Sequence, residues 1–238
     1  MTNLILVPGM WLGGWAWDAV AAPLRTAGHD VTAVTLGGLA ERAAEARTAT
    51  LESHIADVLD AVGDRPSVVL VAHSYGGMPV RAVADRLGER VRRVIYVDSG
   101  PLPDGAVQAD FGGPEARRRT EQSLIDGYLI PPPSFDPADE PVRFAGLDGM
   151  TAWIRERVTP HPWATATDAL HIKHAEQPPT ELICSTFPVP VTREMIDGGH
   201  PFFAGLDRHD YRLHELTTGH WPMFSRPADL AALLDALA

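Results

Sequence analysis

An apolar run that ends at a serine between small residues is the feature that most constrains the fold of this chain. Residues 68–77 read Val-Val-Leu-Val-Ala-His-Ser-Tyr-Gly-Gly, and apolar residues at helical spacing follow at Met78, Val80, Val83 and Leu87. This pattern predicts a buried strand that turns sharply into a helix. Small residues at 72 and 76 let the strand and helix backbones come close at the turn.

The predicted turn holds the Ser74 side chain in a tight, exposed bend. The stretch Ala72-His73-Ser74-Tyr75-Gly76 follows the G-x-S-x-G spacing, with alanine in place of the first glycine. That spacing, between a strand and a helix, is typical of a nucleophilic serine, so we expect Ser74 to be a nucleophile. The alternative is an ordinary strand–helix corner whose serine caps the helix.

Short apolar runs recur along the chain, and segments with helical spacing lie between them. The expected strands are Leu4–Val7, Val31–Leu36, Val68–Val71, Val94–Val97, Leu182–Cys184 and Tyr211–Leu216. The expected helices are Trp15–Ala27, Leu51–Val62, Met78–Leu87, Thr192–Phe203 and Pro227–Leu237. This alternation predicts an α/β fold, a mostly parallel sheet of about six strands flanked by helices. Ligands of such sheets bind outside the carboxyl ends of the strands.

Residues 100–179 interrupt the alternation. They contain no strand-like run, include three consecutive prolines at 131–133, and show helical stretches near Gly113–Gly127 and Leu147–Val158. The segment is too long for a loop inside a compact domain, and its apolar content favours a packed lid over a loose surface excursion. We therefore expect an α/β core formed by residues 1–99 and 180–238, with a helical lid inserted at 100–179.

Composition excludes several classes of partner. The net charge of −11 argues against nucleic acid or an anionic membrane. Cys184 is the only cysteine, which excludes an intramolecular disulfide and a cysteine-based metal site. The chain enters a strand directly, and no apolar run reaches the roughly 18 residues that span a bilayer. We expect one cytoplasmic domain with no cofactor and no metal.

A glycine-rich loop follows the first expected strand. It reads Pro8-Gly9-Met10-Trp11-Leu12-Gly13-Gly14. Glycine directly after a strand lets the backbone approach a ligand closely, and a loop in this position can donate a backbone N–H to an oxyanion. We expect the N–H groups of Met10 and Tyr75 to form an oxyanion hole. A glycine-rich turn that serves packing alone is the alternative.

One of the ten histidines has the position expected of a general base. His220 lies in Thr217-Thr218-Gly219-His220-Trp221-Pro222-Met223, between the last strand and the last helix, where its ring could reach Ser74. His73 is expected to pack under the neighbouring loop. His171 and His174 lack a third ligand at metal spacing. The remaining histidines considered, His161, His200, His209 and His214, show no partner pattern.

These motifs together resemble a known family. The first loop, the serine turn and the Gly-His-Trp-Pro-Met stretch are similar to those of α/β-hydrolases, in the branch of salicylate-type methylesterases and hydroxynitrile lyases. Pro8 stands where that branch usually has a histidine. The resemblance covers both ends of the chain well and the lid poorly. It implies an esterase core whose catalytic residues follow the order serine, acid, histidine.

The acid departs from that resemblance. The branch usually has an aspartate just after the penultimate strand, but here Phe187 occupies that position. Asp98 follows the expected strand Val94–Val97, next to the serine strand, and some α/β-hydrolases take their acid from there. We expect Asp98 to orient His220, with an Asx-turn as the alternative role. Asp197 and Asp207 are the fallback candidates.

Aromatic residues gather near the expected site and predict an apolar pocket, with Trp11, Trp221 and Trp153 as candidate substrate contacts. The sequence therefore predicts a cofactor-independent serine hydrolase of a small to medium apolar ester or lactone. It would act through an acyl-enzyme formed at Ser74. A lactone-forming or acyl-transferring enzyme on the same residues, and a non-catalytic ligand-binding homologue, are the alternatives.

Other enzyme classes fit less well. A nucleotide-dependent oxidoreductase would need an acidic residue after the second strand, where Thr35-Leu36-Gly37 stands, and a short-chain dehydrogenase would need a tyrosine four residues before Lys173. Hydroxynitrile lyases of this branch use a lysine near the position of Pro188. A dehalogenase needs a carboxylate where Ser74 stands.

Overall fold

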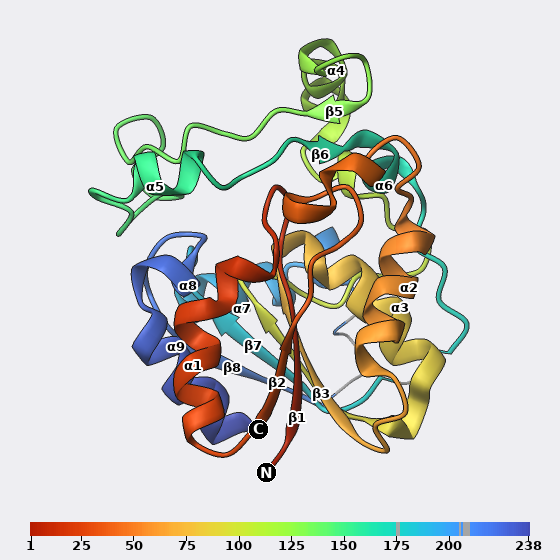
Figure 1. Cartoon of the computed structure of the whole chain (residues 1–238), viewed down its shortest axis with the longest axis vertical. Coiled ribbons are helices and arrows are strands. Elements are labelled where there is room, and N and C mark those ends of the chain that lie inside the picture. The colour runs from red at the N-terminus through yellow and green to blue at the C-terminus, as the bar shows by residue number, and fades with distance from the viewer. Residues whose placement is uncertain (175–176, 205, 207–209) are drawn as a thin grey trace.

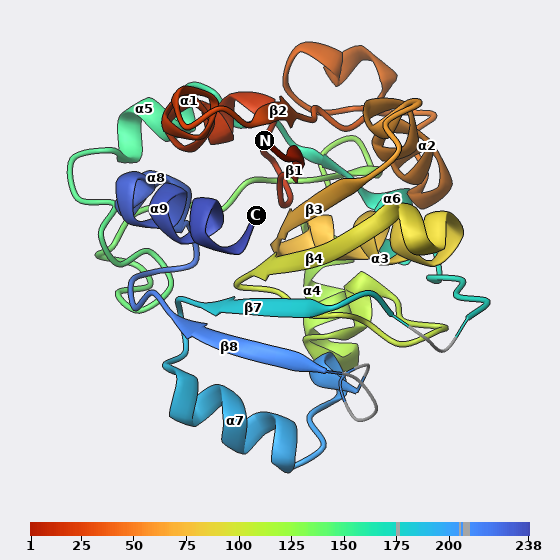
Figure 2. The same ribbon diagram turned by 90° about the horizontal axis from the view of Figure 1, so that it is seen from below.

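The protein is a six-stranded parallel sheet with helices on both faces (Figures 1 and 2). The computed structural model describes residues 1–174, 177–204, 206 and 210–238 of the 238-residue chain. The strand order is β2-β1-β3-β4-β7-β8, and every pair is parallel. The strands are β1 (Asn3–Val7), β2 (Asp30–Ala33), β3 (Val68–His73), β4 (Val91–Val97), β7 (Thr180–Cys184) and β8 (Tyr211–Glu215). The predicted fold class is confirmed.

Helices cover the two faces of the sheet as packed pairs. α1 (Asp18–Thr26) packs against α9 (Pro227–Leu237) on one face, and α2 (Leu51–Val62) packs against α3 (Gly77–Leu87) on the other. α7 (Val189–Asp197) contacts the edge strand β8, and α8 (Pro222–Ser225) precedes α9. Short 3₁₀ helices lie at Gly14–Trp17, Ala40–Glu45, Ser74–Gly76, Gly88–Arg90, Gln108–Asp110 and Pro201–Phe203.

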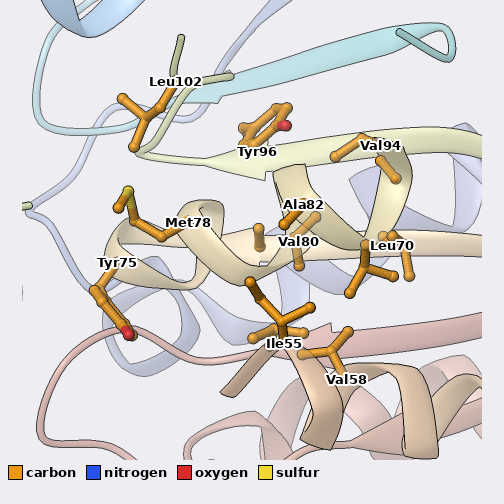
Figure 3. Packing of buried hydrophobic residues seen from close by; sticks show 14 of the residues in the cluster. Ile55, Val58, Leu70, Tyr75, Met78, Val80, Ala82, Val94, Tyr96 and Leu102 are labelled. Carbon is orange, nitrogen blue, oxygen red and sulfur yellow. The ribbon is translucent and has the colours of Figure 1, made fainter. Parts of the chain in front are cut away.

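The central strand β3 carries the core on both of its sides. All six of its residues are buried, and their side chains alternate between the two faces of the sheet. Val69 and Val71 join the layer beneath α1 and α9, whereas Leu70 and Ala72 join the layer beneath α2 and α3. Figure 3 shows Leu70 in that second layer, gathered with apolar side chains of α2 and α3.

The helices of the segment between β4 and β7 lie across the carboxyl ends of the strands, at the end of the molecule away from both termini (Figure 1). These helices are α4 (Gly113–Ser123), α5 (Thr151–Arg155) and α6 (Trp163–Thr167). Two short strands, β5 (Leu129–Ile130) and β6 (His161–Pro162), pair antiparallel within the segment. The sequence did not predict these strands because two residues are too few to show a period. The division into core and lid stays a prediction.

Several boundaries differ from the sequence-based expectation. β2 ends at Ala33, not at Leu36. The expected helix Thr192–Phe203 is α7, which ends at Asp197, followed by a separate 3₁₀ turn. Gly198 and Gly199 end α7, and Gly199 has φ +68°, a conformation that favours glycine. Within the described ranges, we find no helix with the length and apolarity to cross a bilayer.

Candidate active site

The serine corner depends on close contact between the start of the helix and the end of β1. β3 ends at His73, and Ser74 has φ +50°, in the left-handed region. A Cβ atom at Gly76 would lie 2.8 Å from the carbonyl oxygens of both Val7 and Pro8. Only glycine therefore fits at residue 76 without a shift of backbone. The corner leaves Ser74 at the carboxyl end of the sheet, partly exposed.

The loop after β8 brings His220 to Ser74. His220 Nε2 lies 2.9 Å from Ser74 Oγ, although 146 residues separate the two positions. Both backbone groups of His220 are held: its N–H donates to the Arg143 carbonyl of the lid at 2.8 Å, and its carbonyl accepts from His73 Nε2 at 2.7 Å. The imidazole is thus anchored from the lid and from the serine strand together.

Asp98, at the end of β4, completes a chain of three side chains. Its Oδ2 lies 2.5 Å from His220 Nδ1 and accepts the Thr186 hydroxyl at 2.6 Å. Its Oδ1 accepts the backbone N–H groups of Ser185 and Thr186 at 3.2 and 2.9 Å. β4 and β7 pair in parallel with Val97 opposite Ile183, which explains why the turn after β7 reaches the carboxylate.

The surroundings of Asp98 keep it ionised. Burial of the carboxyl acts to raise its pKa, but hydrogen bonds from His220 and Thr186 outweigh burial and hold the pKa of Asp98 well below its ordinary value. A carboxylate at this position accepts the Nδ1 proton of His220. When the ring is neutral, this leaves Nε2 unprotonated and facing the Ser74 hydroxyl, which is the arrangement a general base requires.

His73 lies beneath the loop that follows β1. Its burial, together with the nearby His220, lowers the pKa of His73 to about 3, so the ring stays neutral. Its Nδ1 has no hydrogen-bond partner among the described residues. A Cβ atom at Gly9 would lie 2.8 Å from that nitrogen and 3.0 Å from Ser74 Cβ, so glycine lets the loop close over the corner.

The loop after β1 and the serine corner carry the two expected oxyanion donors. Met10 follows Gly9 directly, and Tyr75 follows Ser74. The Tyr75 side chain is buried away from the site, with its hydroxyl 2.8 Å from Nδ1 of His54. The backbone N–H groups of Met10 and Tyr75 therefore belong to segments that meet at Ser74, and their role as oxyanion donors stays a prediction.

The three tryptophans expected to contact substrate lie in different surroundings. Trp221 is buried, with its ring 4.8 Å from that of His220. Trp11 donates from Nε1 to the lid carbonyl of Ile130 at 3.2 Å. Trp153 packs edge-on against Trp15 on the side of the molecule that carries α1. Substrate contact by any of them stays a prediction.

A cavity of about 640 Å³ opens beside His220 and Asp98. Phe187 is 48% exposed and lines it, at the position where the family resemblance places an acid. The fallback acid Asp197 is exposed at the end of α7. Asp207 and His209 lie outside the described residues. Across the part of the chain that the structure describes, we find no cluster of three or more residues suited to hold a metal ion.

Sequence reasoning missed the groups that hold the three side chains in place. Thr186 binds Asp98 through its N–H and its hydroxyl, and the Arg143 carbonyl binds the N–H of His220. The two hydroxyl residues that follow the end of β7, Ser185 and Thr186, were a usable signal for Thr186. No local signal marked Arg143, because a backbone carbonyl of an irregular segment carries no sequence signature.

Comparison with known proteins identifies the family of this chain. The sequence pattern of the α/β-hydrolase family matches residues 4–233. The chain belongs to the α/β-hydrolase family. As a family member, it also resembles a solved extracellular α/β-hydrolase from a Paenibacillus species, with a TM-score of 0.82, 24% identity and 98% of each chain covered. That protein is described as sharing structural and functional homology with tobacco salicylic acid binding protein 2.

Curated relatives of this α/β-hydrolase are esterases. It is 44% identical over 102 residues to a carbendazim-hydrolysing esterase of Nocardioides sp. (strain SG-4G), a match that spans 42% of each chain. It is 27% identical over 270 aligned positions to methylesterase 7 of Arabidopsis thaliana, covering 99% of this chain and 96% of the relative. Both relatives are named as esterases, and the second belongs to the methylesterases that the motifs resemble.

Proposed function

We propose that this protein is a serine hydrolase of a small to medium apolar ester or lactone, and that it acts through an acyl-enzyme. The observation that carries the proposal is the unbroken chain of hydrogen-bond distances from Ser74 Oγ to His220 Nε2 and from His220 Nδ1 to Asp98 Oδ2, at 2.9 and 2.5 Å. Few arrangements other than an activated nucleophile place these three groups in this order.

In the first half of the reaction, Ser74 Oγ attacks the ester carbonyl while His220 Nε2 takes the hydroxyl proton. The carbonyl oxygen becomes an oxyanion, which the N–H groups of Met10 and Tyr75 stabilise by about 3 kcal/mol each. The tetrahedral intermediate collapses, the bond to the alcohol oxygen breaks, and His220 gives that oxygen its proton. The products of this half are a free alcohol and an ester of Ser74.

In the second half, water attacks the Ser74 ester and His220 takes a proton from it. The second tetrahedral intermediate releases the carboxylic acid, and the proton returns to Ser74 Oγ. Asp98 holds the imidazole in the correct tautomer in both halves and stabilises the imidazolium that forms in each. Atoms balance as ester plus water giving acid plus alcohol.

The non-catalytic alternative was based on Phe187 in the usual acid position. Asp98 at hydrogen-bond distance from His220 supports the catalytic proposal over that alternative. Lactone formation or acyl transfer uses the same Ser74 ester, with an alcohol in place of water. Product analysis with an added alcohol distinguishes these reactions from hydrolysis.

The test is turnover of p-nitrophenyl acetate or butyrate by the full chain and by a Ser74→Ala variant. We expect turnover by the wild type and its loss in Ser74→Ala, with an acyl adduct at Ser74 visible by mass spectrometry of the quenched wild type. A wild type that shows neither turnover nor a burst of p-nitrophenol would contradict the proposal.

A further inference from the structure

The cavity beside His220 has no role in the chemistry derived above. Its walls come from the end of β7, from α7 and the turn after it, and from two lid segments. His220 and Asp98 line it, and Ser74 is not among the described residues that do. A molecule in this cavity would therefore lie on the histidine side of the nucleophile.

Several of the exposed apolar side chains of the protein line the cavity. The described residues include seven large apolar side chains that are at least a third exposed, and three of these, Phe111, Val142 and Phe187, line the cavity. The Phe111 ring of the lid meets the Phe202 ring of the core edge-on at 5.5 Å, which joins the two walls. Exposed apolar groups collected around one hollow favour binding of an apolar ligand.

The carboxylates and the arginine that line the cavity are paired. Glu140 and Arg143 at its lid wall form an ion pair at 3.3 Å, and Asp98 is bonded to His220. Burial raises the pKa of the Cys184 thiol, which keeps it protonated. A charged occupant would find no unpaired countercharge among these groups, so the cavity fits a neutral group.

The direction of proton transfer identifies which half of an ester lies there. His220 Nε2 must deliver its proton to the leaving alcohol oxygen, so that oxygen lies within hydrogen-bond reach of His220. We propose that the cavity is the binding site for the alcohol half of the ester, a neutral apolar group as large as a bicyclic ring. This inference rests on the proposed function, and the volume of about 640 Å³ lies in the range of small-molecule sites.

Position 187 determines this specificity. Thr186 holds Asp98 through its N–H and hydroxyl, and the next residue, Phe187, lines the cavity. A carboxylate at 187, where the family resemblance places the acid, would make this wall charged. Because the acid comes from β4, residue 187 is an apolar side chain and the cavity accepts an apolar group. A methyl ester would leave most of this space empty.

Two isomeric esters test the assignment. 2-Naphthylmethyl acetate has the bulky group in the alcohol half, and methyl 2-naphthylacetate has it in the acyl half. The two leaving alcohols are similar in acidity. We expect the wild type to have the higher kcat/KM for 2-naphthylmethyl acetate. Met195→Trp, on the cavity side of α7, should lower that kcat/KM roughly tenfold and change that of the methyl ester less than twofold.

Val191→Trp is the matched control, since Val191 lies on the same helix, is 39% exposed and does not line the cavity. Preference for the methyl ester, or an equal loss for both esters in Met195→Trp, would overturn the inference. A separate test that does not depend on turnover is the binding of 2-naphthalenemethanol to the Ser74→Ala variant, measured by fluorescence. If the alcohol binds to Ser74→Ala but the wild type turns over neither ester, only the proposed function is rejected. If the alcohol does not bind, the cavity assignment is rejected.

Discussion

At the scale of single residues, the site depends on backbone conformations that side chains rarely adopt. Ser74 and Asp98 have φ values of +50° and +45°. Aspartate tolerates the left-handed region better than most residues, and the Asp98 N–H is held by the Ile183 carbonyl at 2.9 Å. From this conformation the Asp98 carboxylate reaches His220, with Oδ2 2.5 Å from Nδ1.

The first prediction concerns the choice of acid. Asp98→Asn should lower kcat by roughly 10⁴, because an amide cannot hold His220 in the tautomer that leaves Nε2 free. The matched control is Asp197→Asn, at the exposed end of α7, which should have kcat within about twofold of the wild type. Circular dichroism verifies that both variants fold. The opposite ranking of the two variants would assign the acid to Asp197.

At the scale of elements, the lid and the histidine loop are joined through their backbones. Gly219 donates its N–H to the Ala145 carbonyl at 3.2 Å, and the next N–H binds Arg143. A Cβ atom at Gly219 would lie 2.6 to 2.7 Å from backbone atoms of Arg143 and Ala145. Glycine here lets the two segments approach closely enough to place the His220 ring.

The second prediction follows from that contact. Gly219→Ala should push the lid segment away from the histidine loop, lowering kcat more than tenfold and stability by about 1–3 kcal/mol. Hydrogen exchange should show faster exchange of the N–H groups of residues 219 and 220. Gly198→Ala, at the exposed end of α7, is the control and should retain wild-type kcat. Unchanged exchange and kcat in Gly219→Ala would show that the lid does not position the base.

At the scale of the whole molecule, buried neutral histidines connect stability to pH. Burial lowers the pKa of His54, His73 and His161 below the ordinary value. In the unfolded chain these groups titrate near pH 6.5. Below that pH the unfolded chain takes up protons that the folded protein does not, so the free energy of unfolding falls as the pH falls.

The third prediction is the slope of that dependence. His73 and His161, whose pKa values are lowered furthest, should each cost about 1.4 kcal/mol of stability per pH unit below about 6.5, and nothing above it. His161→Phe should reduce the slope of the free energy of unfolding against pH by the equivalent of about one proton. The control His171→Phe, at an exposed position, should not. Urea unfolding between pH 5 and pH 8 measures both. A wild-type free energy of unfolding that stays flat over this range would contradict the prediction.

The sequence by itself determined the alternation of strands and helices, the strand–serine–helix corner, and the choice of Ser74 and His220 as candidates. These features depend on side-chain periodicity and on turns of a few residues, and both can be recognised from residues close together in the sequence. The short lid strands, the end of α7 and the Arg143 contact were not predictable in this way.

The sequence offered Asp98 only as an expectation, from its place after the strand next to the serine strand, and the tertiary structure decided that it meets His220. The two residues are 122 positions apart, and Phe187 stood where the family resemblance placed an acid. The parallel register of β4 and β7 brings the Asp98 carboxylate to the turn at Thr186, and the lid holds the loop that carries His220. Contacts between segments so distant depend on packing and register, which no local pattern encodes.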